Sequence, residues 1–307
     1  MSAAPGRTKG ALLPAAALMF NAFVWGVSWW PLRQLEAHGV HPLWATAIIY
    51  VVSLGCLLAA RPLAWRGLLQ HPLLWLLMAA SGLTNISFNW AVTVGDVVRV
   101  VLLFYLMPLW AALLAWPLLG EKPTAISLSR MSLALVGVVI VLKTGDSAWP
   151  VPESVADWLA LMGGFSFALT NILLRRLNHT PAESRVLAMF SGGALMATSA
   201  ACLGMARGVV ALPPAPAASW LVFAVALSLA FLIGNLALQY GAARLSSHGT
   251  ALIMLSEVVF ASASSVAMGA AGLTGRTWLG GGLILLAALW SALSDDKPAP
   301  SARRRAG

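Results

Sequence analysis

The sequence has very few charged residues for its length. Only 9% of its 307 residues are Asp, Glu, Lys or Arg, and 60% are hydrophobic. A soluble globular domain carries about 25% charged residues. Little of the chain is therefore left for a soluble domain, and we expect the protein to function within a membrane.

Cysteine and the common catalytic motifs are scarce as well. Cys56 and Cys202 lie in hydrophobic segments, at a spacing that fits neither a metal site nor a disulfide framework. The five histidines fall near predicted loops, and no HExxH, GxGxxG or GxxxxGK[ST] motif occurs. We expect no enzymatic activity, no metal ion, no cofactor and no direct use of ATP.

Ten hydrophobic segments fill the chain almost from end to end. About 20 apolar residues in a helix cross a hydrocarbon core of about 30 Å, because a helix rises about 1.5 Å per residue. We therefore predict an all-α membrane protein with ten transmembrane helices. The segments are 12–31, 42–60, 72–93, 97–119, 124–143, 155–176, 184–204, 218–240, 248–271 and 277–294.

The basic residues are distributed unequally between the two sides of such a protein. If the N-terminus is cytoplasmic, 14 of the 19 Lys and Arg residues fall on the cytoplasmic side and 5 on the other. The positive-inside rule then favours cytoplasmic placement of both termini. Because the net charge of +9 is spread between the segments, nucleic acid is not an expected partner. Residues 295–307 are predicted to form a basic, disordered tail.

The chain divides into two similar halves, residues 12–143 and 155–294. Residues 25–35 align with 167–177 at an offset of 142, and the fourth and fifth segments align with the ninth and tenth at an offset of 150. Five spans are an odd number, so the second half would insert upside down, as in many secondary transporters. The alternative is that apolar helices align with one another easily.

Several short motifs are similar to those of a known transporter family. The fourth segment, RVVLLFYLMPLWAALLAWPLLGE, has a proline in mid-helix and ends in Gly120-Glu121. Trp25-Gly26 in the first segment, Gly137 in the fifth and Ser256-Glu257-Val258 in the ninth fit the same pattern. The chain thus resembles the EamA-type members of the drug/metabolite transporter superfamily.

This resemblance implies ten spans, alternating access and, usually, export of small organic metabolites, with amino acids and related compounds as the leading substrates. It also implies multi-pass insertion in the cell inner membrane. Val258 stands where the first half has Pro108, and Ala270-Ala271 stand where it has Gly120-Glu121. The second half therefore lacks this proline kink and the terminal glutamate.

Glu257 is the one acidic residue well inside a predicted span. It lies about ten residues into the ninth segment, where an ionised carboxylate costs about 2.5–3.5 kcal/mol. It could carry a proton in exchange for substrate or bind a substrate amine. A neutral glutamic acid that is hydrogen-bonded to a neighbouring helix is the equally weighted alternative.

Amides and aromatic side chains recur at helical spacing in the other spans. Such groups can orient a ligand and enclose its apolar part, although they also hold helices together without any substrate. Pro108 interrupts the hydrogen bonds of the fourth span and is the candidate gating residue. The candidate substrate-binding residues are Asn21, Trp25, Trp29, Asn85, Asn89, Tyr105, Asn171, Asn235 and Glu257.

Together these observations predict a secondary transporter that exports a small organic metabolite, with protons as the candidate coupling ion. Its expected partners are that substrate and the lipid bilayer. Gly280–Gly282 permit close approach of helices, either within the fold, which is favoured, or in a homodimer. A metabolite uptake permease and a membrane scaffold that transports nothing remain as alternatives.

Overall fold

The computed structural model describes residues 9–120, 124–143, 151–242, 244–245, 247–272 and 274–293. Every helix or strand assigned in these ranges is an α-helix, as predicted. Glu121 and the predicted tail, residues 295–307, lie outside the described residues.

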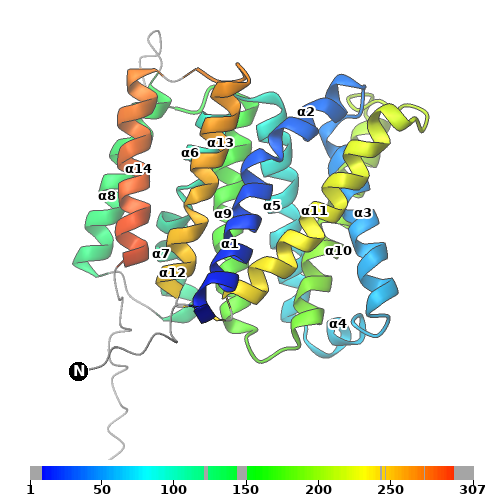
Figure 1. Cartoon of the computed structure of the whole chain (residues 1–307), viewed down its shortest axis with the longest axis horizontal. Coiled ribbons are helices and arrows are strands. Elements are labelled where there is room, and N and C mark those ends of the chain that lie inside the picture. The colour runs from blue at the N-terminus through cyan, green and yellow to red at the C-terminus, as the bar shows by residue number, and fades with distance from the viewer. Residues whose placement is uncertain are drawn as a thin grey trace, which may run out of the picture.

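Fourteen helices are assigned, and the long ones run side by side across the molecule (Figure 1). The first half contains α1 (Lys9–Val27), α2 (Trp29–Ala37), α3 (Pro42–Ala60), α4 (Arg66–Gln70), α5 (Leu73–Val94), α6 (Val97–Phe104), α7 (Met107–Leu119) and α8 (Ala125–Leu142). The second half contains α9 (Val155–Arg176), α10 (Ala182–Ala206), α11 (Ala218–Ala242), α12 (Ser247–Met254), α13 (Ser256–Ala267) and α14 (Gly275–Leu293).

Among the described residues, seven helical segments are long and apolar enough to cross a membrane. They are α1–α2 from Leu12 onward, α3, α6–α7, α8, α9, α10 and α11. The other three predicted spans correspond to α5, α12–α13 and α14, which are helical. In α5 the polar residues Thr84, Asn85, Ser87 and Asn89 lower the hydropathy. The structure thus supports a multi-pass membrane protein, and the count of ten remains a prediction.

Helices from the two halves pack against each other throughout. α5 lies against α9 and α10, α1 lies against α11 and α13, and α8 pairs with α14. Glycines permit the closest of these approaches: a Cβ atom built on Gly137 of α8 would lie 2.6 Å from the carbonyl oxygen of Gly280 on α14. Small residues at such contacts let helix backbones approach within a membrane.

Two of the predicted spans are broken in the middle. The fourth span is interrupted between Phe104, the last residue of α6, and Met107, the first of α7. Pro108 explains this break, since it has no N–H group to donate to the carbonyl of Phe104. The ninth span is interrupted between Met254 and Ser256.

The break in the second half forms without a proline, since Val258 stands at the position of Pro108. It needs no proline because side chains take the carbonyl groups that the backbone releases. The Ser256 hydroxyl donates to the Ile253 carbonyl at 2.6 Å, and the Tyr105 hydroxyl lies 3.1 Å from the Met254 carbonyl. A serine that bonds the backbone in this way competes with the helical pattern.

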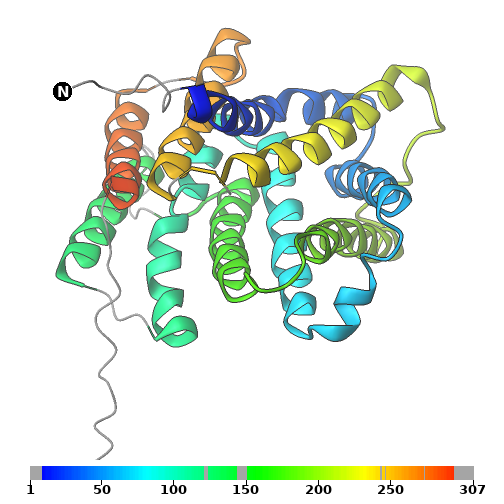
Figure 2. The ribbon, with the colours of Figure 1, turned by 60° about the horizontal axis from the view of Figure 1, so that its bottom comes forward.

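The two broken spans meet at one end and separate at the other. α6 packs against α13, whereas contacts between α7 and α12 are at most marginal. α7 instead packs on α8 and α9, and α12 packs on α1 and α14. α7 and α12 lie at the lower end of Figure 1, and Figure 2 turns this end toward the viewer. We call this end of the molecule the α7–α12 end.

Candidate functional site

The two helix breaks meet at Tyr105 and Glu257. Tyr105 follows the last residue of α6, and Glu257 is the second residue of α13. The Tyr105 hydroxyl lies 3.3 Å from Oε2 of Glu257 and 3.1 Å from the carbonyl oxygen of Met254. Both side chains are buried. The carboxyl group of the ninth span therefore lies in the interface between the halves, beside a phenol of the first half.

Asn21 of α1 reaches the same place. Its Nδ2 lies 3.6 Å from the sulfur of Met254, while its Oδ1 is buried without a hydrogen-bond partner. Most buried amide oxygens are paired, and an unpaired one costs free energy. Asn21, Tyr105 and Glu257 are thus gathered around Met254, and the buried Asn21 amide oxygen has no hydrogen-bond partner among the described residues.

Five aromatic rings from both halves form a layer next to this group. Trp25 stacks on Phe231, with ring centres 4.4 Å apart, and meets Phe88 edge to face at 5.9 Å. Phe104 lies 4.8 Å from Phe88 and 5.4 Å from Phe167. We call these five residues the aromatic layer. Offset and edge-to-face arrangements such as these are the favourable ones.

Each of the four amides Asn21, Asn85, Asn171 and Asn235 lies one helical turn from a ring of the aromatic layer. Asn21 precedes Trp25 by four residues and Asn85 precedes Phe88 by three, whereas Asn171 and Asn235 follow Phe167 and Phe231 by four. α1 and α5 run away from the α7–α12 end, and α9 and α11 run towards it. All four amides therefore lie on the α7–α12 side of the aromatic layer.

These amides are incompletely bonded. Asn85 is buried and Asn171 is exposed, and neither hydrogen-bonds through its side chain to another described residue. Asn235 accepts a bond from Nε2 of Gln239 at 2.8 Å. Together with Asn21, they could supply donors and acceptors to a polar molecule that enters from the α7–α12 end.

The structure does not bring Trp29 and Asn89 together with Glu257. The indole N–H of Trp29 donates to the Ser264 hydroxyl at 2.9 Å, and the Asn89 amide donates to the Thr46 hydroxyl at 3.2 Å. Both residues lie beyond the aromatic layer from the α7–α12 end. In this state both side chains link helices.

The opposite end of the molecule is held by an ion pair that the sequence did not reveal. The guanidinium group of Arg99 binds both carboxylate oxygens of Asp157, at 2.7 and 2.9 Å, and donates to the Val141 carbonyl at 2.8 Å. The pair links α6 of the first half to α9 of the second, with the two-pronged geometry that favours arginine.

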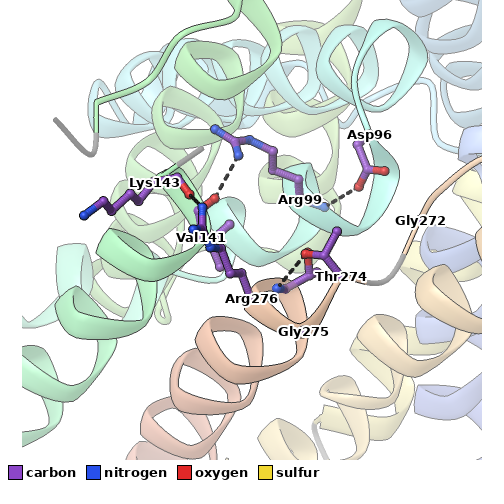
Figure 3. Close-up of a pocket in the computed structure, with 9 residues that line it drawn as sticks. Asp96, Arg99, Val141, Lys143, Gly272, Thr274, Gly275 and Arg276 are labelled. Carbon is purple, nitrogen blue, oxygen red and sulfur yellow. Dashed lines mark hydrogen bonds between the residues drawn. The ribbon is translucent and has the colours of Figure 1, made fainter. Parts of the chain in front are cut away.

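A pocket of about 730 Å³ lies at this opposite end, between α6, α8 and α14 (Figure 3). Asp96, Arg99, Lys143 and Arg276 supply its charged groups. Arg276 is exposed and donates to the Lys143 carbonyl at 3.1 Å. None of the residues around Glu257 lines this pocket, so the two places are separate.

Sequence reasoning missed the rings that line the site. It identified Trp25 but not Phe88, Phe104, Phe167 or Phe231. A usable signal was present, since three amides each have a phenylalanine at one-turn spacing on their own helix. Phenylalanine is so common in membrane spans that an amide and a phenylalanine one turn apart do not by themselves indicate a binding site.

Comparison with known proteins gives one family. Residues 12–143 match the model of the EamA-like transporter family. The first half of this chain is EamA-like. The family is one of transporters within the drug/metabolite superfamily and not one of enzymes. The resemblance drawn from the sequence motifs is thereby confirmed.

The chain also shares its fold with solved proteins. The chain is similar to one protein of known crystal structure, with 20% sequence identity and a TM-score of 0.58. The aligned region covers 93% of this chain and 98% of the other. At this identity the likeness shows the fold alone. No curated protein matches the chain.

Proposed function

We propose that this EamA-like protein is a secondary transporter that exports a small organic metabolite across the cell inner membrane by alternating access. In this proposal, residues 12–143 and 155–294 form two inverted repeats of five spans, and both termini are cytoplasmic. The observation that carries it is the meeting of two broken spans, one from each half, at Tyr105 and Glu257.

The pattern of helix contacts supports two equivalent halves. Suppose that each helix is replaced by its counterpart in the other half. The pair α1–α11 then becomes α9–α5, and the pair α3–α11 becomes α10–α5. All four of these pairs pack in the structure. The pairs α3–α10 and α8–α14 map onto themselves, and both pack as well. The last residues before the breaks, Phe104 and Met254, are 150 residues apart, which is the offset of the sequence alignment.

The broken spans depart from this symmetry in the way that alternating access requires. Exchange of the halves converts the pair α6–α13 into α12–α7, yet only the first pair packs closely. A carrier that opens to one side at a time must have one such pair closed and its counterpart open. We infer that the described state is closed at the end held by Arg99 and Asp157, and open at the α7–α12 end.

Glu257 is the proposed coupling and binding residue, with Asn21, Trp25, Asn85, Tyr105, Asn171 and Asn235 beside it. Pro108 is the proposed gating residue because it forces the break in the fourth span. Trp29 and Asn89 would join the site only in another state. An amino acid or a related compound is the proposed substrate, and protons are the proposed coupling ion. Assembly as a homodimer is part of the same proposal.

The decisive experiment compares metabolites that are released by cells producing the wild-type chain, the Glu257→Gln chain or neither, at equal membrane abundance. We expect one compound to be enriched by the wild type and to be lost with Glu257→Gln. A Ser265→Ala chain is the matched control, because this hydroxyl lies on the same helix, α13, and donates to the Ser262 carbonyl of its own helix, away from Glu257.

The outcome separates the alternatives. Enrichment that persists with Glu257→Gln would keep the exporter and reduce Glu257 to a structural residue. If no compound is enriched, labelled amino acids would be offered to the same cells; accumulation would support the uptake permease. Absence of transport in both directions would leave the membrane scaffold.

A further inference from the structure

The Tyr105 hydroxyl faces two acceptors but has one proton to donate. The Met254 carbonyl lies 3.1 Å away and the Glu257 carboxyl oxygen 3.3 Å away. A phenol can donate only one hydrogen bond, although its oxygen can also accept. Tyr105 therefore cannot donate a hydrogen bond to Met254 and to Glu257 at the same time, although both acceptors lie within hydrogen-bonding distance.

The charge of Glu257 decides between the two acceptors. An ionised carboxylate is the stronger acceptor, so Tyr105 donates to Glu257 and the Met254 carbonyl loses its partner. A protonated Glu257 can itself donate to the Tyr105 oxygen, which leaves the Tyr105 proton for Met254. A substrate amine that pairs with the carboxylate would release Tyr105 in the same way.

Among the described residues, no other charged side chain lies where it could change which of the two acceptors Tyr105 bonds. α13 packs against α1, α6 and α12. The charged side chain that α6 contributes, Arg99, is bound to Asp157. On α12, His248 lies at the start of the helix, two turns from Glu257 along the chain, and its side chain is not described. On α1, Lys9 is the charged residue and lies at the opposite end of that helix from Val27.

The Met254 carbonyl group lies at the junction of α12 and α13, where the loss of its hydrogen bond can change the position of α12. Met254 is the last residue of α12, and no proline fixes the backbone at the break that follows it. An unpaired carbonyl in a dry interior is unfavourable, so α12 gains by shifting to recover a partner. α12 has at most marginal contact with α7, so no packing against that helix opposes the shift.

We propose that Tyr105 is a positioning residue that transmits the state of the Glu257 carboxyl group to the α12–α13 break by exchanging its one hydrogen bond between Glu257 and Met254. The proposal rests on the proposed function, in which α12 and α7 form the opening of the carrier. It makes Tyr105 the link between proton or substrate binding and the opening at the α7–α12 end.

The test measures the separation of α7 and α12 without any substrate. Spin labels would be attached at Ala112→Cys and Thr250→Cys, in a chain with Cys56→Ser and Cys202→Ser, and distances recorded in lipid nanodiscs from pH 5 to pH 9. We expect the ratio of two distance populations to change roughly tenfold or more across this range, a common size for coupling between sites.

Tyr105→Phe removes the hydroxyl and keeps the ring, so the distance populations should no longer respond to pH. Tyr50→Phe is the matched control, because Tyr50 is equally buried but its hydroxyl bonds to no other described residue. This control should keep the wild-type response. Glu257→Gln, alone or combined with Tyr105→Phe, should be insensitive to pH.

A wild-type response that survives in Tyr105→Phe would overturn the proposal, and so would a wild type whose distances do not depend on pH. Because the measurement needs no substrate, it is independent of the transport assays. Failure of export with an intact pH response would contradict the proposed function and leave the Tyr105 exchange standing.

Discussion

Asn21 offers the clearest separation of a binding role from a structural one at the scale of single residues. Its amide oxygen is buried and has no partner among the described residues, so Asn21→Leu removes this unsatisfied group together with one weak N–H···S contact to Met254. We expect the free energy of unfolding to fall by less than about 1 kcal/mol and transport to be lost. Thermal unfolding in detergent and transport by the same preparation would measure both effects.

Asn89→Leu is the control for this comparison. The Asn89 amide oxygen also has no partner among the described residues, but this substitution breaks the bond to Thr46 and leaves that hydroxyl unpaired in the interior. It should lower stability by about 1–3 kcal/mol. If Asn21→Leu destabilised the protein as much as Asn89→Leu, Asn21 would be a structural amide and not part of a binding site.

Individual polar residues could be selected from the sequence, but their partners could not. Asn21, Tyr105 and Glu257 stand out because a polar side chain in an apolar run needs a reason to be there. Which of them meet depends on helix rotation and on the breaks. The pairing of Arg99 with Asp157 joins residues that are 58 positions apart, and nothing in either local sequence predicts it.

Among the helices, α6 approaches α9 closely at Gly164. A Cβ atom at Gly164 would lie 2.6 Å from the carbonyl oxygen of Phe104, the group that Pro108 leaves without its helical donor. Gly164→Ala should therefore push α6 away from α9 and lower the free energy of unfolding by about 1–3 kcal/mol. Chemical or thermal unfolding of the purified protein measures this loss.

Gly55→Ala in α3 is the matched control, because a Cβ atom there would meet nothing within 4 Å. Alanine is the better helix former by about 1 kcal/mol, so this variant should be as stable as the wild type or more so. Equal stability of the two variants would mean that the α6–α9 contact is looser than the distances indicate.

Hydrophobic length and periodicity predicted the helices well, and their breaks less well. The break at Pro108 followed from the chemistry of proline. The break at Leu255 did not, because its causes are a serine that bonds its own helix and a tyrosine from another span. Only the folded arrangement brings Tyr105 to that position.

For the molecule as a whole, the direction of the opening depends on how the chain is oriented in the membrane. The positive-inside rule predicts that Arg244, at the α7–α12 end, faces the cytoplasm and that Arg276, beside the pocket at the other end, faces outward. Both side chains are exposed. In a chain without Cys56 and Cys202, Arg276→Cys should react with a membrane-impermeant maleimide in intact cells, and Arg244→Cys only after permeabilisation.

This orientation decides what the described state can do. If the labelling follows the prediction, the amides beside the aromatic layer face the cytoplasm, where an exporter must collect its substrate. The reverse pattern would turn the α7–α12 end outward, so that the same open state would collect substrate from outside, as an uptake permease does. Reaction of both cysteines in intact cells would require that the two positions lie on one side, which would contradict the odd number of spans predicted between them.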